Sequence, residues 1–175
     1  MKTRTLFPCV VVIGLAATAF VPASWVVVRV DERASVALPA NYQATPGVEP
    51  AHMLSGHDAA GVYMAISSPL GAAFQGKRRQ EYYDSMIGEI VNQCQGKVVD
   101  RSAFSLGGFE GVEAAVSGTR PGTKQPFFVC LRGLLVGKKA YVFQFIPNDG
   151  GKNSQAQRKP FFNSIALKPF PVPGK

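Results

Sequence analysis

The sequence has few of the residues on which catalysis and metal binding depend. Its 175 residues include two histidines and three cysteines. No Gly-x-Ser-x-Gly elbow, phosphate-binding loop or dinucleotide fingerprint occurs, and the glycine pairs lie between predicted strands rather than before a helix. A serine hydrolase needs a general base beside its nucleophile, and two histidines in one short segment leave few to recruit. These absences predict a non-enzymatic protein without a cofactor.

The remaining candidate chemistry also favours structural roles. His52 and His57 lie near Asp58, but this spacing does not fix both imidazoles on one face of an element, so we expect surface histidines and no metal site. A glycosidase carboxylate pair must flank a cleft. The carboxylates of the predicted helix instead share a solvated face: Glu81, Asp84 and Glu89. Both cysteines outside the N-terminal segment fall inside regular elements, which argues against a nucleophilic cysteine.

Acidic residues are nearly absent from the last third of the chain. Residues 120–175 hold ten basic side chains against Asp149 alone, whereas residues 24–119 hold seven basic and ten acidic side chains. This asymmetry has two interpretations, a solvated basic face or a surface that binds anionic phospholipid or glycan. Nucleic acid is not expected, because the N-terminal segment described next predicts an exported chain. The candidate binding surface consists of Lys77, Arg78, Arg79, Lys138, Lys139, Arg158 and Lys159, with Lys152 near the last pair.

A long apolar run occurs only at the N-terminus. Lys2 and Arg4 precede the apolar residues 6–20, and Val21-Pro22-Ala23 supplies a small-residue cleavage site. Fifteen residues are short for a bilayer span, which takes about 20. We therefore predict a signal peptide over residues 1–23 and an exported, periplasmic or secreted protein. The alternatives are a cut after Ala19 and an uncleaved anchor.

Cleavage would leave two cysteines, Cys94 and Cys130, in a compartment that permits disulfides. A bridge between them is one prediction, and two small buried thiols are the other. Phe127, Val129 and Leu131 form the more apolar face of their strand, so Cys130 is expected to point away from the predicted helix, and hence from Cys94.

The 152 residues after the signal fit one domain. Apolar residues at spacings of three and four between Lys77 and Cys94 predict a long amphipathic helix, with Gly96 just past its end. A short helix burying Phe161 or Phe162 is expected between Ser154 and Ser164. Strand patterns separated by turn residues cover 25–30, 34–38, 52–54, 61–67, 97–104, 111–116, 126–136 and 140–146. The predicted class is α+β, a mainly antiparallel sheet with the long helix and the short C-terminal helix packed on one face.

The order of these elements, together with the placement of the turns, is similar to that of a known protein family. A hairpin ends in Val36-Ala37-Leu38-Pro39, the helix is followed by Gly96-Lys97-Val98-Val99, a turn reads Leu106-Gly107-Gly108-Phe109-Glu110-Gly111, and the chain closes on Leu135 to Phe143 and Phe161 to Ile165. This pattern, over residues 25–167, resembles the α/β sandwich of the PsbP-like proteins and of the Ran-binding nuclear import factor. Members with known roles are mostly non-enzymatic and bind other proteins. No site residue carries over.

The sequence thus predicts three segments, a signal peptide (1–23), one PsbP-like α+β domain (24–167) and a flexible tail (168–175). The resemblance implies a non-catalytic exported domain that binds a protein partner or assembly at the cell envelope. Attachment of the basic surface to anionic phospholipid or glycan is the alternative function.

Overall fold

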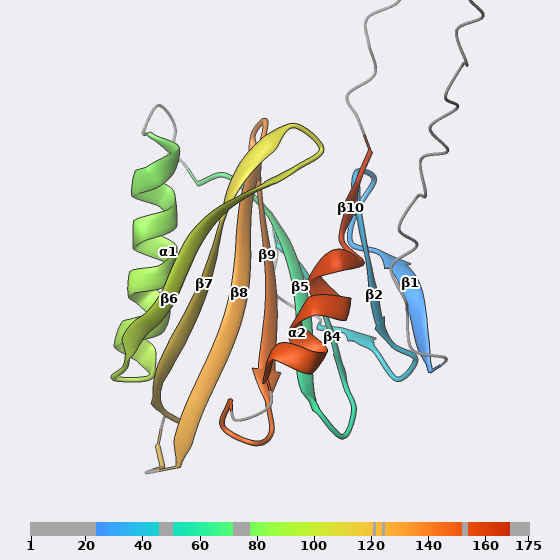
Figure 1. Cartoon of the computed structure of the whole chain (residues 1–175). Coiled ribbons are helices and arrows are strands. Elements are labelled where there is room, and N and C mark those ends of the chain that lie inside the picture. Colours follow the sequence, from blue (N-terminus) through green and yellow to red (C-terminus); the bar gives the residue numbers. More distant parts are fainter. Residues whose placement is uncertain are drawn as a thin grey trace, which may run out of the picture.

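The structure, a computed structural model, describes residues 24–45, 51–71, 78–120, 122–123, 125–151 and 154–168. The predicted signal, the tail beyond residue 168, Lys77 and Lys152 lie outside the described residues. The described residues form two sheets and two helices (Figure 1). Within the described ranges no helix is long and apolar enough to cross a membrane.

The predicted first hairpin is confirmed. Strand β1 (Trp25–Arg29) pairs antiparallel with β2 (Ala34–Pro39), because the Oδ1 atom of Asp31 accepts hydrogen bonds from the amides of Arg33 and Ala34 at 2.8 and 2.9 Å and closes the turn. Strand β10 (Ala166–Leu167) pairs with the other side of β2. The result is a small sheet in the order β1-β2-β10.

The large sheet has seven antiparallel strands in the order β3-β4-β5-β9-β8-β7-β6. Positive φ angles at Gly107, Gly108 and Gly137 allow the tight turns between β6 and β7 and between β8 and β9. The mainly antiparallel α+β class is therefore confirmed. The strands are β3 (Gln43–Ala44), β4 (His52–His57), β5 (Gly61–Pro69), β6 (Lys97–Leu106), β7 (Phe109–Thr119), β8 (Pro126–Val136) and β9 (Lys139–Pro147).

Three strand predictions were wrong in detail. The segment around Gly56 does not break β4, since Ser55, Gly56 and His57 pair with β5. Strand β7 runs through Gly118 to Thr119, past the predicted end at residue 116, and β3 lies in a segment for which no strand was predicted. Gly118 is needed for close approach: a Cβ there would lie 2.4 Å from the carbonyl oxygen of Cys94.

The two helices cover opposite faces of the large sheet, not one face as predicted. Ala114 of β7 packs with Tyr83 and Ile87 of α1 (Arg79–Gln93), whereas its neighbour Ala115 belongs to the cluster with Phe161 and Phe162 of α2 (Ser154–Asn163). Successive strand residues point to opposite faces, so each helix has its own core. Figure 1 shows α1 beside β6 and β7, far from the small sheet.

Helix α1 is 15 residues long, an ordinary length rather than a long one. Its end differs from the prediction, because Gln95 and not Gly96 takes the left-handed conformation, with φ 47°. The amides of Gln95 and Gly96 close the helix on the carbonyls of Asn92 and Val91. Gly96 serves a different purpose, since a Cβ there would lie 2.4 Å from the carbonyl oxygen of Ser117.

The larger core lies between the large sheet, α2 and the small sheet. Both Phe161 and Phe162 are fully buried, where one of the two was expected. The ring of Phe161 makes edge contacts with Tyr63 and Trp25, at centroid distances of 5.3 and 6.4 Å. Tyr63 in turn stacks on Phe145 of β9. These aromatic contacts lock the small sheet and α2 onto one face and leave the other face to α1.

Candidate functional site

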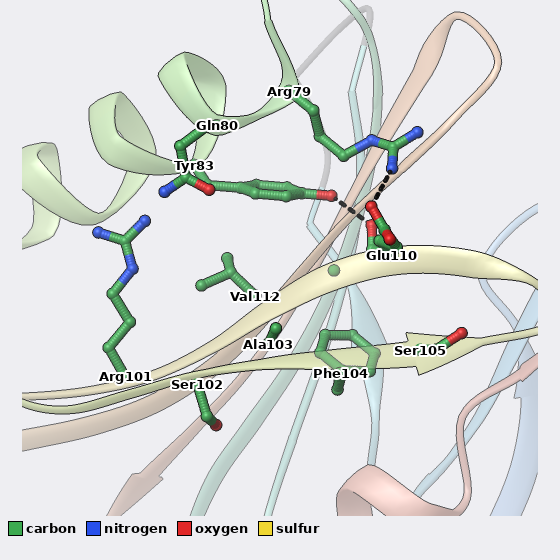
Figure 2. A pocket seen from close by; sticks show the side chains of 11 residues that line it. Arg79, Gln80, Tyr83, Arg101, Ser102, Ala103, Phe104, Ser105, Glu110 and Val112 are labelled. Carbon is green, nitrogen blue, oxygen red and sulfur yellow. Dashed lines mark hydrogen bonds and ion pairs between the residues drawn. The ribbon is translucent and has the colours of Figure 1, made fainter.

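An open groove of about 880 Å³ lies between α1 and the β6–β7 hairpin and is called the α1 groove below (Figure 2). Three elements contribute its walls. The lining residues come from the first turns of α1 (Arg79, Gln80, Tyr83), from β6 (Arg101 to Ser105) and from β7 (Glu110, Gly111, Val112).

The floor of the groove is apolar and fixed. Ala103 of β6 and Val112 of β7 are direct cross-strand partners on the face that α1 covers. Above them, the hydroxyl of Tyr83 donates to the carbonyl oxygen of Glu110 at 2.9 Å and accepts from the amide of Leu135 at 3.1 Å. Burial raises the pKa of Tyr83, so the phenol stays neutral. Because Ala103 is small, the space beside the Tyr83 ring is left open.

The rim carries charges that neutralise one another. At one end Arg79 contacts Glu110 at 3.2 Å (Figure 2), and at the other end Arg101 contacts Asp84 at 2.5 Å. Gln80 also donates to Asp84, at 2.9 Å. The Arg101 hydrogen bond lowers the pKa of Asp84, so this pair stays charged at neutral pH. A rim of matched ion pairs gives the groove no net attraction for an anion.

The predicted basic surface does not form one cluster. Arg78 and Arg79 begin α1 and pair with Glu81 and Glu110. Lys138 lies exposed at the tip of the β8–β9 hairpin, and Lys159 lies exposed on α2. Lys77 is outside the described residues. The remaining two members of the predicted surface, Lys139 and Arg158, form ion pairs with carboxylates of the same domain.

Arg158 is a correction, because it is buried rather than part of a surface. Its guanidinium bridges the carboxylate of Glu113 and, at 3.4 Å, that of Asp100. Glu113 also accepts from Arg132 at 2.5 Å. The Arg132 guanidinium lies over the rings of Phe104 and Phe162, at 4.8 and 4.9 Å, and donates to the Phe162 carbonyl. These contacts fasten α2 to the large sheet.

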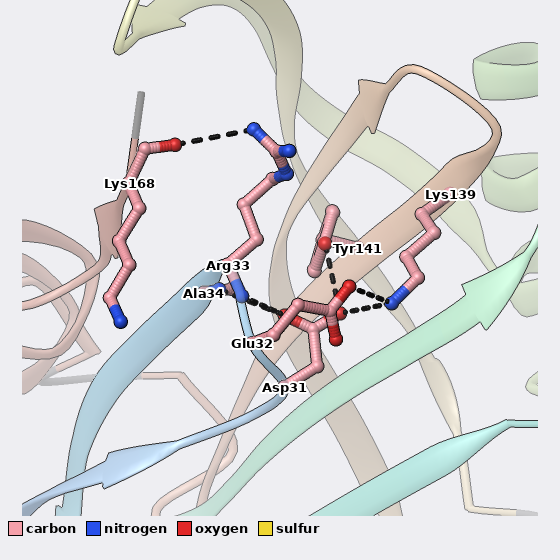
Figure 3. A network of polar contacts seen from close by, with 7 residues as sticks. All are labelled: Asp31, Glu32, Arg33, Ala34, Lys139, Tyr141 and Lys168. Atoms are coloured by element: carbon pink, nitrogen blue, oxygen red, sulfur yellow. Dashed lines mark hydrogen bonds and ion pairs between the residues drawn. The ribbon is translucent and has the colours of Figure 1, made fainter. Parts of the chain in front are cut away.

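Lys139 joins the two sheets. Its ammonium lies 3.0 Å from Asp31 and 2.7 Å from Glu32, in the turn of the first hairpin (Figure 3). Tyr141 donates to the same Asp31 carboxylate at 2.9 Å. Burial alone would raise the pKa of Asp31, but hydrogen bonds from Ala34, Arg33, Lys139 and Tyr141 together hold it below its ordinary value.

The cysteines and histidines are dispersed. Cys94 packs in the α1 core and Cys130 in the opposite core, and both are free, so the structure contains no bridge between them. Burial raises the pKa of Cys130 to about 11, which keeps the thiol protonated. His52 and His57 occupy the two ends of β4, and both are exposed. Across the described ranges no three potential ligand side chains gather as a metal site.

Sequence reasoning found one part of the α1 groove and missed the rest. The helical spacing singled out Tyr83 as a buried stripe residue, but it did not indicate Arg101, Ala103, Glu110 or Val112. The signal for these residues was the Gly107-Gly108 turn. A two-residue hairpin there sets the register that places Ala103 opposite Val112.

Comparison with solved structures gives the fold. The solution structure of cyanobacterial PsbP (CyanoP) from Synechocystis sp. PCC 6803 matches with a TM-score of 0.58 at 8% identity, over 89% of this chain and 99% of that one. A Pseudomonas aeruginosa protein of unknown function, PA94, described as a putative regulator, matches with a TM-score of 0.49 at 14% identity, over 85% of this chain and 99% of that one. LpqN, involved in cell envelope biogenesis of Mycobacterium tuberculosis, matches with a TM-score of 0.48 at 14% identity, over 83% and 91%.

These identities show the fold alone, and the first match confirms the predicted PsbP-like architecture. No family model matches the sequence. No curated protein is significantly similar to it either.

Proposed function

We propose that this chain is an exported, non-catalytic domain that binds a protein partner at the cell envelope, and that the α1 groove receives an apolar segment of that partner. The proposal rests on the structure of the groove, which is open, has an apolar floor and has a rim whose charges are paired with one another. Such a surface favours an uncharged side chain on a polypeptide over an anionic small molecule.

Two observations support a non-catalytic role. The groove's titratable side chains, Arg79, Arg101, Glu110 and Tyr83, are all engaged in ion pairs or hydrogen bonds. The protein's nucleophile candidates are remote from its bases, since Cys94 and Cys130 are buried in separate cores and the histidines are exposed on β4. Export is supported by the charged start, short apolar run and small-residue site of residues 1–23.

Attachment to an anionic surface through the basic residues has less support. Four of these basic residues already form an ion pair with a carboxylate of the same domain: Arg78, Arg79, Lys139 and Arg158. Lys138 and Lys159 are the exposed members of the predicted set that no described carboxylate pairs. Two exposed lysines on different elements provide only weak electrostatic anchoring.

The test uses two variants of exposed β6 residues, one in the lining of the groove and one outside it. Ala103→Trp fills the groove without adding charge, and Val99→Trp adds a side chain of the same size at a residue that does not line the groove. Cross-linking in the producing cell, followed by recovery of the chain from the envelope fraction, should give one stoichiometric protein partner with the wild type and with Val99→Trp. Ala103→Trp should lose that partner.

Salt separates this proposal from surface attachment. A partner held in an apolar groove should remain bound when salt rises well above physiological strength, where exposed charges are screened over a few ångströms. Retention of the partner by Ala103→Trp would contradict the groove. Release of the chain by salt, or by Lys138→Glu with Lys159→Glu, would show attachment by surface charge instead.

A further inference from the structure

Among the described residues the two sheets end in four strand edges, and three of these edges carry features that prevent pairing with another chain. Strands β3 and β10 have two residues each. Strand β6 carries Lys97, Asp100 and Arg101, and its register with β7 shifts between Val98 and Asp100. Short length, charge and bulges are the means by which natural sheets protect their edges. The fourth edge is β1.

Strand β1 has no bulge, is longer than two residues and carries one charge, Arg29 at its end. It reads Trp25-Val26-Val27-Val28-Arg29, with no charge before its last residue, no proline and an unbroken register against β2. Val27 is 69% exposed and Val26 is 41% exposed. Figure 1 shows β1 on the side of the molecule opposite α1, so this edge is separate from the α1 groove. An apolar, unprotected edge strand invites pairing with another strand.

Hydrogen bonds at the two ends of the hairpin show which β1 residues direct their backbone outward. Ser24 accepts from the Ala40 amide at 2.9 Å, and the Val30 amide donates to Ala34 at 2.9 Å. Hydrogen-bonded pairs alternate along an antiparallel ladder. The intervening residues that face β2 are therefore Val26 and Val28. The amides and carbonyls of Trp25, Val27 and Arg29 then point away from the sheet.

We infer that this edge pairs with the same edge of a second copy of the chain, antiparallel, about a two-fold axis at Val27. In that register Val27 lies opposite the partner's Val27, and Trp25 lies opposite the partner's Arg29. Each of these pairs exchanges two hydrogen bonds, so every outward backbone group of β1 finds a partner. A shift by two residues leaves one outward residue of each copy unpaired. The small sheets of the two copies then form one continuous sheet.

The side chains fit this register as well as the backbone does. The exposed valines meet across the axis, Val27 directly and Val26 beside the partner's Val28. Arg29 is exposed and has no ion-pair partner among the described residues. It comes opposite Trp25, whose indole N–H donates to the Asp58 carboxylate at 3.3 Å. The cation thus approaches an aromatic ring and an acid, and the two Arg29 side chains lie at opposite ends of the interface.

A five-residue edge gives a small interface, below the size of stable dimers. The association is therefore weak and concentration-dependent, reached where many copies gather. It leaves the α1 groove of each copy open, so it does not depend on the proposed partner binding.

The test follows the oligomeric state of the exported chain, purified from the envelope fraction after expression of the full sequence. Sedimentation velocity across about 10 μM to 1 mM brackets the affinity of an interface of this size. The wild type should shift from monomer to dimer. Val27→Lys should remain monomeric throughout, because it places two like charges against each other on the axis. Val99→Lys makes the same change at a valine 47% exposed on the protected β6 edge, and should dimerise like the wild type.

Hydrogen exchange tests the register itself. At high concentration the amides of Val27 and Arg29 should exchange about tenfold or more slowly than in dilute protein, whereas those of Val26 and Val28 should be protected at both concentrations. Unchanged circular dichroism of both lysine variants controls for folding. A wild type that stays monomeric at the highest concentration would overturn the inference. So would dimers that Val99→Lys abolishes and Val27→Lys retains.

Discussion

The Lys139 ammonium lies 3.0 Å from the Asp31 carboxylate, and this contact joins the start of β9 to the first hairpin across 108 residues of sequence. Lys139 is one of the cations that the sequence assigned to a binding surface. Asp31 also closes its own turn and accepts from Tyr141, so one carboxylate holds the hairpin closed and docks it on the large sheet. The pair has a structural role.

Asp31 should therefore make folding stability depend on acid. Its pKa is lowered from the ordinary value of 3.8, so the folded state binds the proton more weakly than the unfolded state. The stabilisation is fully present above pH 3.8 and is lost as the pH falls below it, through the folded pKa. Asp31→Asn should cost about 2 kcal/mol near pH 7, the scale of hydrogen bonds to a charged group, and less at low pH.

Urea unfolding at several pH values between neutrality and strong acid measures this difference. Glu110→Gln is the control, because that carboxylate is 84% exposed and its loss should change the free energy of unfolding by less than about 1 kcal/mol at any pH. An Asp31→Asn penalty that stays constant across the acid range would contradict the assignment.

The buried cluster around Glu113 should be far more sensitive than the ion pairs on the surface. Glu113 bridges Arg132 and Arg158, whose side chains are 19% and 7% exposed. Glu113→Ala leaves the buried guanidinium of Arg158 and the partly buried guanidinium of Arg132 without this carboxylate, and should cost about 3 kcal/mol or more. Arg78→Ala removes an ion pair whose arginine is 89% exposed, and should cost less than about 0.5 kcal/mol. Denaturant midpoints of the two variants make the comparison, and equal shifts would show that α2 is not held by this cluster.

Two glycines, one inside α1 and one just past its end, should respond to substitution by alanine with opposite changes in stability. Gly88 has no atom within 4 Å of a built Cβ, so Gly88→Ala should stabilise the helix by about 0.5–1 kcal/mol. Gly96→Ala would force a methyl group to 2.4 Å from the Ser117 carbonyl oxygen and should destabilise by about 2 kcal/mol or more. Thermal unfolding of both variants measures the signs. Stabilisation by Gly96→Ala would mean that α1 lies farther from β7 than the structure shows.

Sequence patterns predicted the structural features that depend on neighbouring residues. They did not predict the features that depend on tertiary contacts. The hairpins at Gly107 and Gly137 follow from turn chemistry within a few residues, and so do the alternating strands that flank them. The placement of the helices on opposite faces did not follow, because Val129 and Cys130 are equally buried although they point in opposite directions. Alternation identifies the core face only when the other face is exposed.

The candidate site shows the same division. Arg158 and Lys159 are adjacent in sequence and resemble a basic pair, but successive helical residues point about 100° apart. One of them is buried against Glu113, which lies 45 residues earlier, and the other is exposed. Tyr83 could be found from helical spacing alone. The ion pairs that bound the α1 groove could not, because Arg101 and Asp84 meet only when β6 packs beside α1.

A count of thiols in the denatured exported protein tests two predictions at once. The sequence has three cysteines, of which Cys9 lies in the predicted signal and Cys94 and Cys130 lie in opposite cores. Cleavage without a bridge should give two reactive thiols, both before and after reduction. Three thiols would show a retained signal. None before reduction and two after it would show a Cys94–Cys130 bridge, which would require one core to open, since the large sheet separates the two side chains.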